Sequence, residues 1–187
     1  MVWIMTNYVT RDGYCHLFFM FFLVCQLLVL SLCLVFQNMI MMTEINYMEQ
    51  GHVEMPRLDE QAMRDWIAAV AASLGKQVGC LTYVFCDDDY ILETNREFLG
   101  HDYYTDIITF DYTNSRHIAG DMVISLDTVR SNAEMLGAPY ETELMRVMIH
   151  GVLHLCGIND KGPGEREIME NHENEALRIL PSNVFLK

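Results

Sequence analysis

The sequence is short of basic residues. It has 12 Lys and Arg residues against 26 Asp and Glu residues, which gives a formal net charge of −14 at pH 7. Proteins that bind nucleic acid over a broad surface through its phosphates need clustered Lys and Arg side chains. The acidic charge balance disfavours this mode of binding. The charge balance does not exclude a small, local contact with RNA.

The chain also has no pair of cysteines at the CxxC spacing. Its six cysteines are scattered, at Cys15, Cys25, Cys33, Cys80, Cys86 and Cys156. This distribution indicates reduced, buried thiols rather than a disulfide framework. We interpret Cys80 and Cys86, which lie in the strand-like run 78–86, as small core residues.

Charge is absent from residues 17–36, LFFMFFLVCQLLVLSLCLVF, a run long enough to cross a bilayer. Three interpretations are open: a membrane anchor, a secretory signal without a small-x-small cleavage site, or translation from a start codon upstream of the true one. The charges that orient a membrane segment are nearly missing, because the neighbouring basic residues are Arg11 and Arg57. We therefore favour a true start at Met39, Met41, Met42 or Met48. We expect residues 1–42 to be a hydrophobic extension that does no folding work, and residues 43–187 to form a single domain.

Hydrophobic periodicity divides this domain into strands and helices. β-Branched and aromatic runs predict four strands, at about 44–48, 78–86, 106–112 and 119–125. Helical spacing of apolar residues, with Asp and Gly residues as caps, predicts five helices, at about 58–74, 87–98, 127–136, 140–156 and 164–180. Their interleaving indicates an α+β fold, in which helices pack on a mixed four-stranded sheet.

The strongest motif is the segment 150–160, HGVLHLCGIND. His150 and His154 are four residues apart, so on a helix their imidazoles lie on one face, one turn apart. Gly157 can take the left-handed conformation that ends the helix, and Asp160 can then return as a third ligand. Two imidazoles and one carboxylate leave the fourth tetrahedral position for water, as in catalytic zinc sites. We therefore predict one zinc ion per chain, bound by His150, His154 and Asp160 and used for hydrolysis.

A pair of core histidines satisfied by hydrogen bonds is the alternative. It is disfavoured because the predicted helix 140–156 is apolar on most sides, where two uncompensated imidazoles would be costly. The spacing is similar to the zincin arrangement HExxHxxGxxH/D, but Gly151 stands where those peptidases carry their Glu general base. A peptidase mechanism would therefore lack its proton acceptor on this zincin-like helix.

Three blocks of the sequence resemble the YbeY family of bacterial endoribonucleases, the rRNA maturation factors. Residues 95–110, NREFLGHDYYTDIITF, are similar to N-x-x-Y-R-x-x-D-x-P-T-D-V-L-S-F, residues 120–125, GDMVIS, to G-D-I-x-I-S, and residues 150–160 to H-G-x-L-H-L-x-G-Y-D-H. The resemblance covers most of residues 43–180 and places His150, His154 and Asp160 at the three zinc-ligand positions. It implies a cytoplasmic, zinc-dependent endoribonuclease, specific for single strands, that acts in ribosomal RNA maturation and ribosome quality control. The implied partners are ribosomal RNA and the ribosome, with no DNA and no membrane.

Two other functions stay open. One is a zinc hydrolase of another substrate, such as a peptide. The other is a non-catalytic, ribosome-associated protein whose metal only stabilises the fold. The open fourth position of the metal site disfavours the second of these, and the shortage of basic residues keeps it under consideration.

The sequence departs from the family pattern at two positions. The third ligand, usually His, is Asp160, which makes the first shell of the metal more anionic. Leu99 stands where the family has an Arg. Arg96 and His101 lie nearby as candidates to replace that Arg, although a solvated helix end and loop is the favoured interpretation.

Four more polar residues are candidates for supporting roles. Asp106 and Asp121 flank strands, where turn capping is favoured over orienting loops near the metal. Glu143 lies seven residues before His150 on the same helix face, as a candidate hydrogen-bond partner. His172 is surrounded by acidic residues, where a solvated face is favoured over a further metal ligand: Glu170, Glu173 and Glu175. No catalytic residue beyond the metal ligands is assigned.

Overall fold

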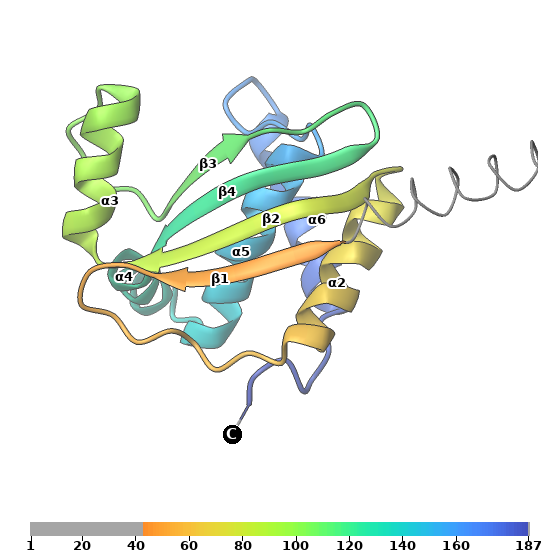
Figure 1. Cartoon of the computed structure of the whole chain (residues 1–187), viewed down its shortest axis with the longest axis horizontal. Helices are drawn as coiled ribbons and strands as arrows, with labels where there is room; N and C mark the ends of the chain where they lie inside the picture. The colour runs from red at the N-terminus through yellow and green to blue at the C-terminus, as the bar shows by residue number, and fades with distance from the viewer. Residues whose placement is uncertain (1–42, 187) are drawn as a thin grey trace, which may run out of the picture. The chain divides into compact units, whose positions relative to one another are not determined.

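A four-stranded mixed sheet forms the centre of the computed structural model, which describes residues 43–186 (Figure 1). The strands are β1 (Glu44–Glu49), β2 (Gln77–Cys86), β3 (Ile107–Asp111) and β4 (His117–Ser125), in the spatial order β1-β2-β4-β3. β1 and β4 each run parallel to β2, and β3 runs antiparallel to β4. The predicted α+β class with a mixed four-stranded sheet is confirmed.

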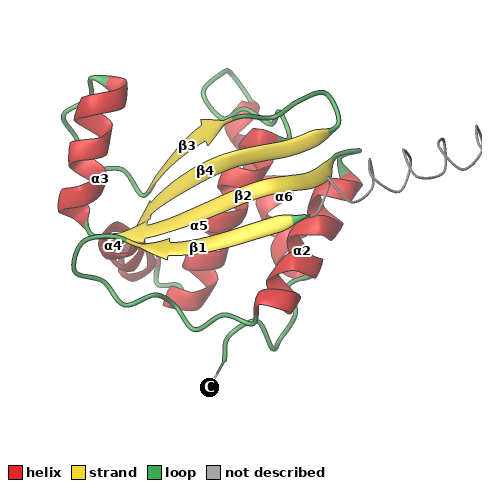
Figure 2. Cartoon of the chain, in the orientation of Figure 1, coloured by secondary structure: helices red, strands yellow, loops and turns green. Residues whose placement is uncertain are grey.

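Helices separate β1, β2 and β3 along the chain, β4 directly follows β3, and three consecutive helices complete the domain (Figure 2). The helical elements are α2 (Glu60–Ser73), α3 (Asp88–Thr94), the π-helix η1 (Asn95–Leu99), α4 (Leu126–Leu136), α5 (Tyr140–Leu155) and α6 (Glu165–Arg178). Side chains cap three of them, because Asp59, Asp87 and Ser125 each accept a hydrogen bond from a backbone N–H of the first turn. All predicted elements are present, and the last turn of the predicted helix 87–98 is the π-helix η1.

The hydrophobic run 17–36 lies outside the described residues. Among residues 43–186, none of the helices combines the length and the apolar composition that crossing a membrane requires.

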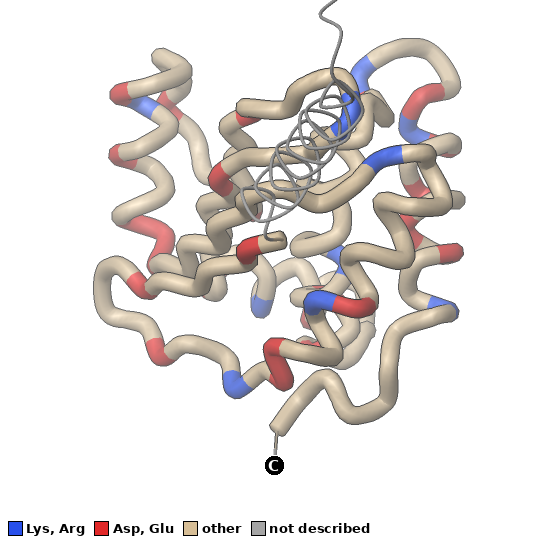
Figure 3. The backbone as a smooth tube through the Cα atoms, turned by 45° about the vertical axis from the view of Figure 1, so that its right-hand side comes forward, with Lys and Arg blue, Asp and Glu red and all other residues tan. Residues whose placement is uncertain are grey.

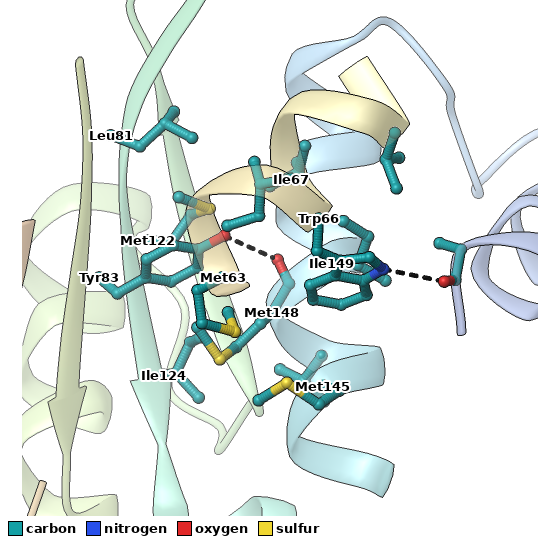
Figure 4. Packing of buried hydrophobic residues seen from close by; sticks show 14 of the residues in the cluster. Met63, Trp66, Ile67, Leu81, Tyr83, Met122, Ile124, Met145, Met148 and Ile149 are labelled. Carbon is teal, nitrogen blue, oxygen red and sulfur yellow. Dashed lines mark hydrogen bonds between the residues drawn. The ribbon is translucent and has the colours of Figure 1, made fainter. Parts of the chain in front are cut away.

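Helix α5 lies at the centre of the core. It contacts α2, α4, α6, β3 and β4, and α2, α5 and α6 lie on the same side of the sheet (Figure 1). Figure 4 shows the buried side chains that meet there: Met63, Trp66 and Ile67 of α2, Leu81, Tyr83, Met122 and Ile124 of the sheet, and Met145, Met148 and Ile149 of α5. The predicted burial of this helix is confirmed.

Two buried hydrogen bonds tie these layers together (Figure 4). The indole Nε1 of Trp66 donates to the backbone oxygen of Ala176 on α6 at 2.9 Å. The hydroxyl of Tyr83 on β2 donates to the backbone oxygen of Met148 on α5 at 3.5 Å. The polar tips of both rings are therefore satisfied inside the core, as burial requires.

Helix α5 comes closest to the sheet at Gly151. A Cβ atom at this position would lie 2.8 Å from Cδ1 of Ile107 on β3 and 2.9 Å from Sδ of Met122 on β4. Residue 151 therefore faces the sheet, and it has no room for the Glu that peptidases place here. His150 and His154 lie on another side of α5.

The predicted core position is confirmed for one of the two cysteines in β2. Cys86 is fully buried, and burial, followed by the nearby Asp87 and Asp88, raises the pKa of its thiol to about 12. Cys80 is exposed, so the prediction of a core position was wrong. Leu81 and Tyr83 on the same strand are buried on the helix-covered face, and side chains alternate along a strand, so Cys80 lies on the opposite face.

Replacing Gly151 with Ala is expected to lower the free energy of unfolding by about 1–3 kcal/mol, because the added methyl group overpacks the contact between α5 and the sheet. In an uncrowded helix interior the same change would raise stability by about 0.5–1 kcal/mol. The sign of the change in urea unfolding, followed by circular dichroism, therefore tests the close approach. A variant at least as stable as the parent protein would contradict overpacking at this contact.

Candidate metal centre

The turn after α5 brings Asp160 back to the two histidines. Gly157 has a left-handed φ of 95°, as its predicted role requires. Its N–H donates to the backbone oxygen of His154 at 2.9 Å, and the N–H of Ile158 donates to that of Leu153 at 3.0 Å. The chain then reverses, so that Asp160 lies beside the helix face that carries both imidazoles.

The three side chains that the sequence singles out lie together. The Nε2 atoms of His150 and His154 are 3.0 Å apart. The carboxylate of Asp160 lies 3.8 Å from each of them, through Oδ2 to His150 and through Oδ1 to His154. Ligand atoms about 2.0 Å from a tetrahedral zinc ion lie roughly 3.3 Å from one another, so the observed spacing is suited to such an ion.

Hydrogen bonds at Nδ1 fix both imidazole rings. Nδ1 of His154 lies 2.9 Å from the backbone oxygen of Ile158, which can only accept, so this nitrogen carries a proton. Nδ1 of His150 lies 2.8 Å from Oε1 of Glu173. Burial alone would raise the pKa of Glu173, but its hydrogen bonds with His150 and Arg146 outweigh burial and lower that pKa. The ionised Glu173 therefore accepts a hydrogen bond from the protonated Nδ1 of His150.

These assignments leave both Nε2 atoms with a lone pair directed at the same point. Two acceptors 3.0 Å apart repel each other unless a cation, either a shared proton or a metal ion, lies between them. Burial and the neighbouring His150 lower the pKa of His154, which disfavours the proton. The carboxylate of Asp160 adds negative charge at the same point. The donor set therefore suits a divalent cation.

The three residues open into a cavity of about 590 Å³. Its wall also carries three basic side chains: Arg146, Lys161 and Arg166. The last residue of η1, Leu99, and residues of the segment between η1 and β3 line it too: His101, Tyr103, Thr105 and Asp106. A substrate in this cavity would touch the candidate metal ligands and that segment together.

Glu173 is the functional residue that sequence reasoning missed. Its predicted environment was a solvated acidic face, but it is only 3% exposed and lies against His150, with Nη1 of Arg146 at 3.1 Å. The sequence contains a usable signal, because Glu173 falls on the buried stripe of α6 between Met169 and Ala176. A charged residue on such a stripe needs a buried partner.

The predicted partner of His150, Glu143, does not take that role. Glu143 is buried, and its carboxylate lies 3.7 Å from Nε of Arg146. Burial raises its pKa. Since Arg146 also pairs with Glu173, Glu143 is linked to the histidine only through these two side chains. His172 lies 3.8 Å from Glu175, outside the group around Asp160, as the favoured interpretation of this residue expected.

The two aspartates that were predicted to flank strands pair with side chains, and only Asp106 lies next to a strand, because Asp121 lies within β4. Oδ2 of Asp106 accepts from Nδ2 of Asn132 on α4 at 3.2 Å, at the wall of the cavity. Oδ2 of Asp121 accepts from the hydroxyl of Tyr112 at 3.2 Å. In the part of the chain that the structure describes, neither carboxylate caps a turn, so the favoured interpretation of these residues was wrong.

Comparison with known proteins identifies the class and then the family. The family model described as Endoribonuclease YbeY matches residues 44–181. The Endoribonuclease YbeY of Phocaeicola vulgatus is 61% identical over 136 residues, covering 73% of this chain and 98% of that protein. The protein of the same name from Bacteroides thetaiotaomicron is 59% identical over 135 residues, covering 72% and 98%. The chain is thus an endoribonuclease with a candidate metal site of two imidazoles and a carboxylate. It belongs to the YbeY family.

A solved structure shares the fold. The solution structure of TM1509 from Thermotoga maritima matches with a TM-score of 0.50 and 24% sequence identity, covering 71% of this chain and 88% of that chain. At this identity the likeness supports the arrangement of the sheet and helices alone.

The proton assignment of the two imidazoles can be tested without metal. In metal-free protein at about pH 8, where unperturbed imidazole is neutral, long-range ¹H–¹⁵N spectra are expected to show a proton on Nδ1 of both His150 and His154. Glu173→Ala should release this constraint on His150 and leave His154 unchanged. An unprotonated Nδ1 at either residue of the parent protein would contradict the assignment.

Proposed function

We propose that this endoribonuclease binds one zinc ion per chain through His150, His154 and Asp160 and cleaves single-stranded ribosomal RNA in rRNA maturation and ribosome quality control. The observation that carries the proposal is the pair of Nε2 atoms 3.0 Å apart, with the Asp160 carboxylate beside both. The name of the family and of its relatives supports RNA as the substrate. The resemblance of the three sequence blocks supports ribosomal RNA and the ribosome as partners.

The surrounding residues support a catalytic rather than a purely structural site. Three protein ligands leave a position open, and the ligands line a cavity. When bound there, zinc would supply Lewis acidity to a phosphodiester oxygen and to water. Glu173 holds His150 in one tautomer and orientation, and Arg146 in turn holds Glu173. Nitrogen and oxygen donors also accept other transition metals, iron(II) among them. Zinc is proposed because two imidazoles, one carboxylate and an open position match the ligand set of catalytic zinc sites.

The charge distribution supports a local contact with RNA. Figure 3 shows the Lys and Arg positions of the described residues scattered among more numerous Asp and Glu positions. Three basic side chains nevertheless line the cavity of the candidate metal centre: Arg146, Lys161 and Arg166. They are placed to contact phosphate oxygens there. Gly151, which faces the sheet, offers no general base for a peptide substrate.

We also propose that residues 43–187 form the whole enzyme domain and that it acts in the cytoplasm. The match of the family model to residues 44–181 supports this division. A domain carried across a membrane would not meet ribosomal RNA. DNA is not expected as a substrate.

Replacing His154 with Ala is expected to remove both bound zinc and RNA cleavage, because one of only two nitrogen ligands is lost. Metal analysis and cleavage of a single-stranded RNA are measured on the same purified samples. The parent protein should contain about one zinc per chain, cleave the RNA, lose that cleavage with chelator and leave casein intact. Asp160→Ala should weaken both zinc binding and RNA cleavage.

The matched control is His172→Ala, which removes a histidine of α6 that lies outside the candidate site. It should retain zinc and activity. Full zinc in His154→Ala would exclude the proposed ligands. Equal RNA cleavage by His154→Ala and the parent protein would point to a contaminating nuclease and would remove the proposed function.

A further inference from the structure

The position of the family's Arg carries no charge in this chain. Leu99 stands there, 49% exposed, on the wall of the cavity that holds the candidate metal ligands. Arg96 does not replace it, because its guanidinium forms an exposed ion pair with Asp102, at 2.6 Å. Arg96 also does not line this cavity, so the part of the wall at Leu99 offers no basic side chain to a phosphate of the RNA.

The segment that follows Leu99 is held in a fixed shape. The nearly buried Asn95 of η1 donates through Nδ2 to the backbone oxygen of Tyr103 at 2.8 Å. Its own backbone oxygen accepts from the N–H of His101 at 3.2 Å. Gly100 supplies the left-handed turn between them, with a φ of 67°. π-Helical turns such as η1 occur frequently at functional sites.

This segment presents two parallel rings to the cavity. The ring centroids of His101 and Tyr103 are 5.1 Å apart with an interplanar angle of 20°. The hydroxyl of Tyr103 lies 3.1 Å from Nδ1 of His101, which locks the two rings together. Tyr103 is 57% exposed, although it lines the same cavity as His150 and Asp160. A large aromatic surface is thus left uncovered next to the candidate metal centre.

We propose that the stacked pair of His101 and Tyr103 binds one nucleobase of the RNA substrate, next to the phosphodiester that is cleaved. The proposal rests on the proposed function and adds a binding site to it. Aromatic side chains bind single-stranded RNA by stacking on its bases, and this contact needs no basic residues. In a duplex the base faces are already covered, so such a site selects single strands. Stacking therefore adds affinity beside Leu99, where the cavity wall offers the RNA no basic side chain, to the phosphate contacts of the basic residues elsewhere on the wall.

The test compares Tyr103→Ala with Tyr103→Phe and Tyr103→Trp in the zinc-loaded full chain. Removing the ring is expected to raise KM for a single-stranded RNA by roughly tenfold or more, with kcat and zinc content little changed. The Phe and Trp variants keep a stacking surface and should stay close to the parent protein. Tyr112→Ala is the matched control, because Tyr112 is 61% exposed and does not line the cavity.

A second substrate locates the contact on the RNA. An RNA that carries one abasic nucleotide beside the mapped cleavage position should bind the parent protein as weakly as intact RNA binds Tyr103→Ala. The losses of affinity caused by Tyr103→Ala and by the abasic nucleotide should not be additive, because both changes remove the same stacking contact. The dependence of binding on salt should be the same for Tyr103→Ala and the parent protein, since no phosphate contact is lost.

Several results would overturn the proposal. Full additivity of the abasic change and Tyr103→Ala would show that the ring does not contact that base. An equal loss in Tyr103→Phe and Tyr103→Ala would show that only the hydroxyl and the loop shape matter. If the parent protein does not cleave RNA, the proposed function fails. The stacking contact can then be tested without cleavage. Fluorescence anisotropy measures the affinities of the same variants for the intact and the abasic RNA, and these affinities are compared in the same way.

Discussion

The contact between α5 and the sheet at Gly151 determines where the rest of the site lies. Because residue 151 faces β3 and β4 without room for a side chain, the neighbouring positions 150 and 154 point along the side of the helix that faces the cavity. The same helix contacts α6, and the Trp66 hydrogen bond ties α6 to α2. The partner of His150 therefore comes from an element whose position is set by the core.

The electrostatics of the site are local and differ from those of the whole chain. A net charge of −14 disfavours contact with RNA. Two carboxylates nevertheless serve the candidate metal centre directly: that of the buried Glu173 and that of the partly buried Asp160. Glu173 accepts a hydrogen bond from Nδ1 of His150, and Asp160 adds negative charge beside the Nε2 atoms of both histidines. A divalent cation held by His150, His154 and Asp160 would offset part of this negative charge, which would favour the approach of a substrate phosphate.

The sequence predicts the centre of this site well because its determinants are local. The spacing of His150 and His154 on one helix, and the Gly157 turn that returns Asp160, depend on neighbouring residues only. Glu173 was missed because its contact with His150 joins residues 23 positions apart on two helices. The same reason applies to the order of the strands, which periodicity does not encode. The packing of His101 on Tyr103 is local, but it depends on the shape of an irregular segment, for which hydrophobic periodicity gives no signal. Cys80 was misplaced because a strand-like run does not show which of its faces the helices cover.

The central claim is that the two Nε2 atoms and the Asp160 carboxylate share one metal ion. X-ray absorption spectroscopy of the zinc-loaded full chain tests it most directly, because the six cysteines of the sequence offer a competing set of ligands with a distinct distance. The account predicts nitrogen and oxygen ligands at about 2.0 Å, with the multiple-scattering signature of two imidazoles and no sulfur at about 2.3 Å. A sulfur shell, or a shell without imidazole, would contradict it.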